Sequence, residues 1–245
     1  MGNSSSPITG TDRYGIYDES SDQQYEIGDR KCFEDGREFV YCKNAAVALT
    51  PGKLIQTAAE VANHANITVA ASVAAGASNK VTLDIGATAI TAGQYENGFL
   101  IINDATGEGV SYKIKSHPTS DGSEEVTFTL YDKVAAALTV DVSQATLVPS
   151  RGMSVIIAPT TKTGSIVGVP LIAVTASYYF WAQSRGPANV LGEGTVGAGD
   201  LVFASNTTAG AVEGYNATDI LEPIVGTARF AITTTEYGIV DLCIN

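Results

Sequence analysis

Two histidines are the first candidates for chemistry in this sequence, because histidine supplies much of the general acid–base and metal-binding chemistry of proteins. These residues, His64 and His117, have no companions at the spacing of a metal site. We interpret His64 as the end of a short helix, where its ring meets the helix dipole, and His117 as a loop residue before Pro118. A Gly-x-Ser-x-Gly nucleophile motif is missing too. The sequence therefore predicts no catalytic residue, no metal site and no cofactor, and hence no enzyme.

One glycine motif matches a nucleotide-binding pattern in its residue types and spacing. Residues 192–197 read Gly-Glu-Gly-Thr-Val-Gly, which satisfies G-x-G-x-x-G. In a dinucleotide site this motif follows a strand and opens a helix whose N–H groups receive the pyrophosphate. Here Gly199-Asp200 leads instead into the strand-like Leu201-Val202-Phe203. We therefore predict a glycine-rich corner that joins two strands.

Carboxylates are the remaining candidates, since a glycosidase needs only two of them across a cleft. The adjacent Glu124 and Glu125 cannot serve, because neighbours in a strand point to opposite faces. Asp18, Glu19 and Asp22 are interpreted as a solvated charge run, and no D-x-D-x-D-G calcium loop is present. A β-built hydrolase that uses carboxylates distant in sequence stays open at this point.

The cysteines, Cys32, Cys42 and Cys243, are too few and odd in number for a disulfide scaffold. Cys32 and Cys42 flank Asp35-Gly36, a signal for a two-residue hairpin turn that would set Cys32 opposite Phe39. Cys42 would then lie about three residues out of register, or roughly 10 Å along the strand. Because a disulfide needs Cα atoms within about 7 Å, we predict free thiols.

Composition and charge restrict the partners of the chain. Its 245 residues carry a formal net charge of −12, which repels phosphate backbones, so we predict no nucleic-acid binding. Hydrophobic residues make up 44% and charged residues 16%, a profile that suits strands and turns. Glycine, proline, serine and threonine interrupt every long apolar run, so we expect no membrane association. No basic segment followed by an apolar run opens the sequence, so we also expect no secretion signal.

Short apolar segments bounded by turn residues recur along most of the chain and predict strands. These segments cover 67–73, 79–85, 98–104, 110–116, 125–131, 154–159, 166–174, 178–184, 200–205, 228–232 and 237–244. They show no strand–helix–strand alternation and therefore favour a mainly β fold, with one or two antiparallel β-sandwich or β-barrel units. Helical spacing of apolar residues adds one or two short helices, at 53–64 and 131–138.

A hairpin over residues 31–43 opens the predicted folded part, and the composition changes near Pro149-Ser150-Arg151-Gly152. We therefore predict a β-rich domain over residues 31–150, beginning with that hairpin, and a second β-rich unit over 151–245.

Residues 1–30 are polar and predict an extended N-terminal arm. Tyr14, Tyr17 and Tyr25 punctuate this arm. Tyrosine gives buried area at a low entropic cost, so the three are candidate contacts with a partner. A passive terminus would have the same composition and is the alternative.

Several segments resemble a pattern found in tailed-bacteriophage virion proteins. An aromatic strand ending in glutamine leads into a Gly-Pro-Ala corner over residues 178–188, and a Gly-Asp turn with an apolar strand follows at 199–202. Residues 223–228, 35–41 and 107–114 extend the resemblance. It implies a capsid decoration, or cement, protein, which is β-rich, binds the outside of an assembled head and clamps neighbouring major capsid subunits. Such proteins are often trimers, and the family implies no catalytic residue.

The resemblance also implies partners and a location. The expected partners are the major capsid protein and further copies of the chain in a homotrimer, on the exterior of a virion assembled in a bacterial host cytoplasm. The acidic charge would keep the free protein soluble, and the arm could lie across a neighbour.

Other functions fit the same β-rich composition. A tail or head-fibre component or a receptor-binding protein is one alternative, and a carbohydrate-binding module or small glycan hydrolase is another. A sugar platform needs exposed aromatic rings, whereas Trp181, the only tryptophan, lies in an apolar strand. We therefore expect Trp181 to pack in the core.

Overall fold

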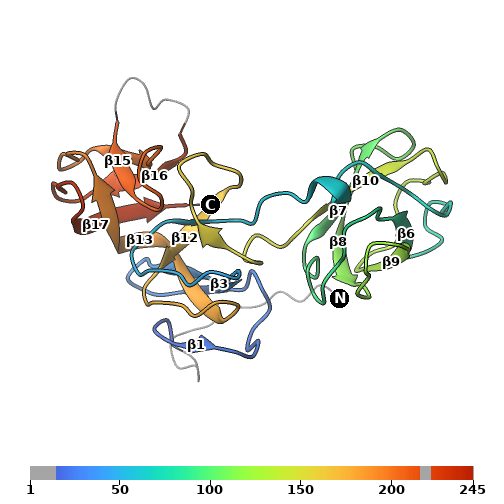
Figure 1. Cartoon of the computed structure of the whole chain (residues 1–245), viewed down its shortest axis with the longest axis horizontal. Helices are drawn as coiled ribbons and strands as arrows, with labels where there is room; N and C mark the ends of the chain where they lie inside the picture. Colours follow the sequence, from blue (N-terminus) through green and yellow to red (C-terminus); the bar gives the residue numbers. More distant parts are fainter. Residues whose placement is uncertain (1–14, 216–221, 245) are drawn as a thin grey trace. The chain divides into compact units, whose positions relative to one another are not determined.

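The computed structural model describes residues 15–215 and 222–244 and divides the chain into two compact β units (Figure 1). Unit 1 comprises the described residues up to Ala58 and those from Arg151 onwards, whereas unit 2 comprises Ala59–Ser150. Strands make up 42% of the structure and helix about 1%. The predicted mainly β fold is confirmed.

Unit 2 is a nearly closed barrel with the strand order β5-β10-β7-β8-β9-β6. Its elements are the 3-10 helix η1 (Ala62–His64) and the strands β5 (Ile67–Thr68), β6 (Lys80–Asp84), β7 (Phe99–Asp104), β8 (Ser111–Ser116), β9 (Glu125–Leu130) and β10 (Gln144–Val148). A bridge between Val69 and Leu83 brings the two ends of the sheet together. Every second residue of β6 and β9 is buried, as the two-residue period of a strand requires.

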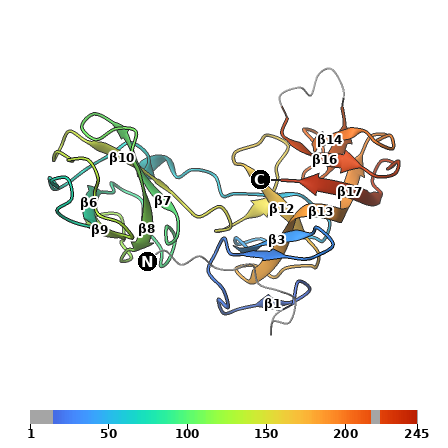
Figure 2. The same ribbon diagram turned by 180° about the vertical axis from the view of Figure 1, so that it is seen from behind.

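Unit 1 is organised around β13, a 15-residue strand that spans Tyr179–Glu193. The other strands are β1 (Glu19–Ser20), β2 (Arg30–Cys32), β3 (Glu38–Lys43), β4 (Ile55–Gln56), β11 (Ile156–Ile157), β12 (Ile166–Pro170), β14 (Leu201–Ala204), β15 (Val212–Gly214), β16 (Ile224–Ala228) and β17 (Tyr237–Cys243). The first half of β13 pairs with β1, β3 and β12, and its second half pairs with β17. Figure 2 shows the same strands from behind.

Five strands of unit 1 close into a ring. They follow the order β13-β17-β16-β14-β15, and β15 returns to β13 through a parallel pairing that sets Gly192 opposite Val212. Each strand contributes one fully buried valine to the core of the ring: Val190, Val202, Val212, Val225 and Val240. β-branched side chains suit this position because they pack well on a pleated surface.

Residues 15–30 do not form the extended arm that the sequence predicted. Residues 15–30 pack on unit 1: β1 pairs with β13, and Ile16 and Ile27 are buried. The Glu19 carboxylate accepts hydrogen bonds from the Thr175 backbone N–H at 2.6 Å and from its hydroxyl at 2.8 Å. Glu19 therefore anchors the segment and is not part of a solvated charge run. Residues 1–14 lie outside the described residues.

The domain boundaries differ from those predicted in one respect. The division between Ser150 and Arg151 coincides with the predicted one, but the predicted domain over residues 31–150 is split after Ala58. The reason is long-range pairing, since β3 pairs with β13, and β4 pairs with β11 and β12. Residues 31–58 therefore share their core with the C-terminal part of the chain.

The two predicted helices are wrong. Within residues 53–64, only the three residues of η1 form a helical turn, and Ile55 pairs with Ile157 of β11 as a strand residue. Residues 131–138 form no helix, because the backbone N–H groups of Val134 and Leu138 donate to carbonyls of residues 78 and 73. In both segments the local spacing of apolar residues favours a helix, but backbone hydrogen bonds to distant strands and loops set the conformation instead.

The predicted hairpin is present, but its register is shifted by one residue. Cys32 lies opposite Glu38, and Lys31 rather than Cys32 lies opposite Phe39. A three-residue loop replaces the predicted two-residue turn, with hydrogen bonds joining Phe33 to Gly36 and to Arg37, and with Gly36 at φ +84°. Cys32, Cys42 and Cys243 are free thiols.

His64 is the last residue of η1 and not of the predicted longer helix, and its ring is fully buried in unit 2. Nε2 faces the Thr88 carbonyl at 3.0 Å and therefore donates to it, which leaves Nδ1 to accept a hydrogen bond from the Tyr95 hydroxyl at 2.6 Å. Burial raises the pKa of Tyr95 to about 12, which keeps this hydroxyl a donor. His117 accepts from the Tyr95 backbone N–H at 3.0 Å through Nε2. Both histidines thus hold the segment around Tyr95.

Replacing the Tyr95 hydroxyl should destabilise unit 2. In Tyr95→Phe the ring remains, but Nδ1 of His64 loses its donor in a buried position, so we expect the free energy of unfolding to fall by about 1–3 kcal/mol. Hydrogen exchange of the full chain, followed on peptides from β6 to β9, measures this loss. Tyr131→Phe is the control, because it removes a surface hydroxyl and should cost less than about 0.5 kcal/mol. Equal exchange in the two variants would contradict the expectation.

Candidate functional site

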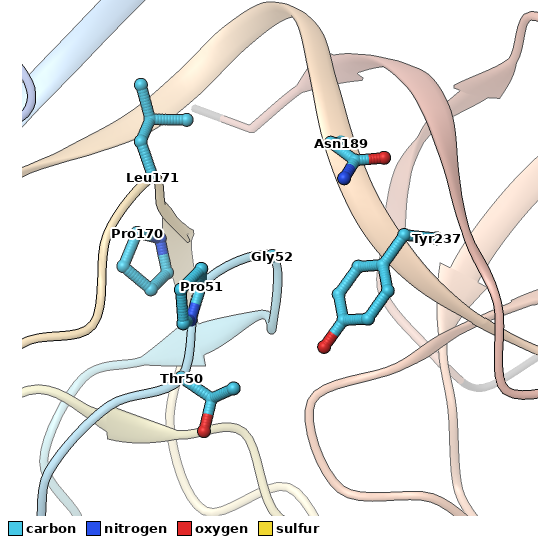
Figure 3. A pocket seen from close by; sticks show the side chains of 7 residues that line it. All are labelled: Thr50, Pro51, Gly52, Pro170, Leu171, Asn189 and Tyr237. Atoms are coloured by element: carbon cyan, nitrogen blue, oxygen red, sulfur yellow. The ribbon is translucent and has the colours of Figure 1, made fainter.

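A pocket of about 320 Å³ opens on unit 1 (Figure 3). It is lined by Thr50, Pro51, Gly52, Pro170, Leu171, Asn189 and Tyr237. These residues come from the loop before β4, the end of β12, the second half of β13 and the start of β17. Two prolines and a leucine supply apolar walls, while one threonine, one asparagine and one tyrosine supply polar atoms. Small-molecule pockets start at about 300 Å³, so this one suits a single ring or a single side chain.

The Tyr237 ring lies directly against the backbone of Gly52. A Cβ atom on Gly52 would stand 2.6 Å from the ring atom Cε1, and Gly52 has φ +71°, so glycine is needed here on both counts. The Gly52 N–H donates to the Pro170 carbonyl at 2.9 Å, and the Leu191 N–H donates to the Gly52 carbonyl at 2.9 Å. One wall of the pocket is therefore fixed by backbone hydrogen bonds to β12 and β13.

The polar side chains of the pocket are not engaged elsewhere. Within residues 15–215 and 222–244, the side chains of Thr50, Asn189 and Tyr237 have no hydrogen-bond partner, and Tyr237 is 45% exposed. The lining contains no charged residue. A ligand would thus meet apolar walls and a few neutral polar groups, which is the usual composition of a binding pocket.

A second feature that local spacing did not reveal is a pair of carboxyl groups at the end of β13. The parallel pairing of β13 with β15 sets Glu193 beside Glu213. The Ser205 hydroxyl donates to Glu193 Oε2, and the Asn206 backbone N–H donates to Glu213 Oε1 at 3.3 Å. Hydrogen bonds from the side chains of Ser205 and then Thr207 hold the pKa of Glu193 below its ordinary value, although partial burial opposes the shift.

This carboxyl pair holds a loop and is not arranged for nucleophilic catalysis. Ser205 is buried, and its hydroxyl accepts hydrogen bonds from the backbone N–H groups of Thr207 and Thr208 at 3.1 and 3.0 Å while it donates to Glu193. Lys162 Nζ donates to the Ser205 carbonyl at 2.6 Å. These bonds fix the connection between β14 and β15.

The three predicted contact tyrosines have different environments. Tyr14 lies outside the described residues. Tyr17 is 63% exposed and available to a partner. Tyr25 packs inside unit 1, with its ring centroid 5.2 Å from that of Tyr41 and 5.1 Å from that of Trp181. The structure therefore does not bring Tyr17 and Tyr25 into one exposed surface.

Trp181 is buried, as predicted, at the centre of an aromatic cluster in unit 1. Its ring lies 5.0 Å from that of Tyr41, and the buried Lys31 places Nζ 4.7 Å from the Trp181 ring centroid. A desolvated cation–π contact of this kind is worth about 2 kcal/mol. Trp181 is therefore a packing residue and not a surface for ligand stacking.

The remaining motifs have structural explanations. β13 ends at Glu193 and β14 begins at Leu201 without an intervening helix, so the glycine-rich segment 192–197 is the predicted corner between strands. Among the described residues, no group of three or more histidine, cysteine, aspartate or glutamate side chains could hold a metal ion. In the same part of the chain, no helix is long and apolar enough to cross a membrane.

Comparison with known proteins found no match. No family model, no curated protein and no solved structure matches the chain.

Acid should weaken unit 1 partly through Glu193. Because its pKa is lower in the folded chain than in the unfolded chain, its hydrogen bonds stabilise the fold above the ordinary glutamate pKa of about 4.3. This contribution disappears as the pH falls through the lowered value. We expect Glu193→Gln to unfold more easily than wild type at about pH 7 and to lose less stability between about pH 5 and pH 2.

Urea unfolding monitored by the fluorescence of Trp181 measures this effect, because the only tryptophan reports on unit 1. Glu34→Gln is the control, since Glu34 is exposed and its side chain accepts no hydrogen bond from the described residues. The assignment of Glu193 fails if its variant keeps the full acid dependence of the wild type.

Proposed function

We propose that this chain is a structural virion protein, a capsid decoration protein that binds the outer surface of a phage head and stabilises contacts between major capsid subunits. The observation that supports it best is the set of exposed apolar side chains on the closed ring of unit 1. Outside the pocket that Tyr237 lines, this set consists of Leu201, Tyr215, Ile224 and Phe230. Exposed apolar patches on a folded protein typically mark surfaces that bind another macromolecule.

Strand register places part of this set on one outer face. Phe203 lies opposite Ile224 across β14 and β16, and Leu201 is two residues before Phe203, so the three side chains share a face. Phe203 is covered by Tyr215, whose ring centroid lies 5.9 Å away, whereas Ile224 is 57% exposed. We call Leu201, Phe203, Tyr215 and Ile224 the outer apolar face.

The closed ring that carries the outer apolar face can bind a partner only through its surface side chains. A closed ring has no unpaired strand edge, so contact has to be made by side chains on its surface. The resemblance to phage virion proteins supports the same role, because its aromatic segment forms β13 and its Gly-Asp turn leads into β14. The proposed partners are the major capsid protein and further copies of the chain in a homotrimer on the capsid exterior.

Undecorated shells of the parent phage provide the test. We expect the purified chain to co-sediment with these shells and to raise their resistance to heat. Leu201→Thr and Ile224→Thr remove apolar surface but keep a residue that strands accept, so each should weaken binding by about tenfold. Val47→Thr is the control, because Val47 is an exposed apolar residue of unit 1 outside the ring.

Failure of the wild-type chain to co-sediment would overturn the decoration role. Equal binding by all three variants would show that the outer apolar face does not contact the shell. Binding to host cells without shells would instead favour a receptor-binding or fibre protein.

A further inference from the structure

We propose that the pocket around Tyr237 binds an extended, proline-containing segment of a partner polypeptide. This inference rests on the proposed function only in taking the partner to be a protein. It concerns a surface separate from the outer apolar face, formed by the Thr50 loop, β12, β13 and β17.

The walls of the pocket suit a pyrrolidine ring or a small aliphatic side chain. Pro51, Pro170 and Leu171 offer carbon surface, and the Tyr237 ring extends toward the loop that carries Gly52 (Figure 3). Aromatic-lined grooves recognise proline-rich segments by enclosing such rings. The pocket volume of about 320 Å³ limits the inserted group to a single ring or side chain.

The polar atoms of the pocket match the backbone of such a segment. A polyproline II helix has no internal hydrogen bonds, so its carbonyl groups need external donors, and its proline residues have no N–H to offer. Thr50, Asn189 and Tyr237 can each donate, and within the described residues their side chains have no other partner. Donors on the protein thus face acceptors on the ligand.

The absence of charge in the lining also favours a neutral segment. The chain has a net charge of −12, yet all seven lining residues are uncharged. A glycan would also be neutral, and Thr50, Asn189 and Tyr237 can accept as well as donate, so a glycan is the competing ligand that the test below must separate from a peptide. A proline-containing peptide satisfies the walls and the donors together.

The site is formed before any ligand arrives. Gly52 is tied to Pro170 and to Leu191 by backbone hydrogen bonds, and the Tyr237 ring rests against it. A polyproline II ligand is also ordered in advance, so binding requires little loss of conformational freedom on either side.

The test is a titration of the isotope-labelled full chain with a blocked hexaproline peptide, followed by NMR. We expect saturable shifts at the pocket residues, centred on Gly52 and Leu191, whose N–H groups report on both sides of the pocket. Tyr237→Thr, which removes the ring, should weaken binding by about tenfold or more. Tyr17→Thr is the control, because Tyr17 is an exposed tyrosine of unit 1 outside the pocket.

Asn189→Asp separates a peptide from a sugar. It keeps the shape of the side chain but replaces a donor by an acceptor, so peptide binding should fall by about tenfold, whereas a sugar hydroxyl could still donate to the carboxylate. Maltohexaose is the matched neutral glycan. The proposal is overturned if hexaproline causes no shifts at millimolar concentration, if the shifts survive Tyr237→Thr, or if only maltohexaose binds.

These outcomes are independent of the shell experiment. The chain could co-sediment with shells while hexaproline leaves the pocket unchanged, which would reject this inference alone. Peptide binding at the pocket without shell binding would retain the inference and reject the decoration role.

Discussion

The backbone of β13 forms hydrogen-bonded ladders with five other strands, and the rest of unit 1 takes its position from them. Its first half is buried from Phe180 to Ser184 without alternation, because Phe180 and Ala182 pack into one hydrophobic cluster and Trp181 packs into another. Its second half closes the ring through β15 and β17. A single strand thus connects the aromatic cluster around Trp181 with the valine core of the ring.

The same strand positions one residue of the pocket and one residue of the carboxyl pair. Asn189 faces the pocket while its neighbour Val190 is buried in the ring, and Glu193 meets Glu213 where the strand ends. A shift of register by one residue would exchange inward and outward side chains along the strand. The pocket would then lose its amide and the ring would lose a core valine. The site and the stability of unit 1 therefore depend on one alignment.

Sequence patterns predicted the local parts of this structure and not the long-range ones. Alternation located β8 and β9 closely, because a strand with one buried face carries that information in its own residues. Residues 53–64 were misassigned as a helix, because the buried Ile55 is held by strands far along the chain. The pocket joins Thr50 to Tyr237, and the carboxyl pair depends on a parallel register. No spacing within the sequence records such pairings.

The interruption of unit 1 by unit 2 has a consequence for biosynthesis. Unit 2 is continuous in sequence, so its barrel can form as soon as Ser150 has left the ribosome. Unit 1 must wait, since the N-terminal strand β3 is completed by β13, and the ring by β17 near the other end of the chain. During synthesis the aromatic residues of β3 therefore stay exposed while the inserted unit folds. The nascent chain is most vulnerable to misassembly in this interval, before its last strands emerge.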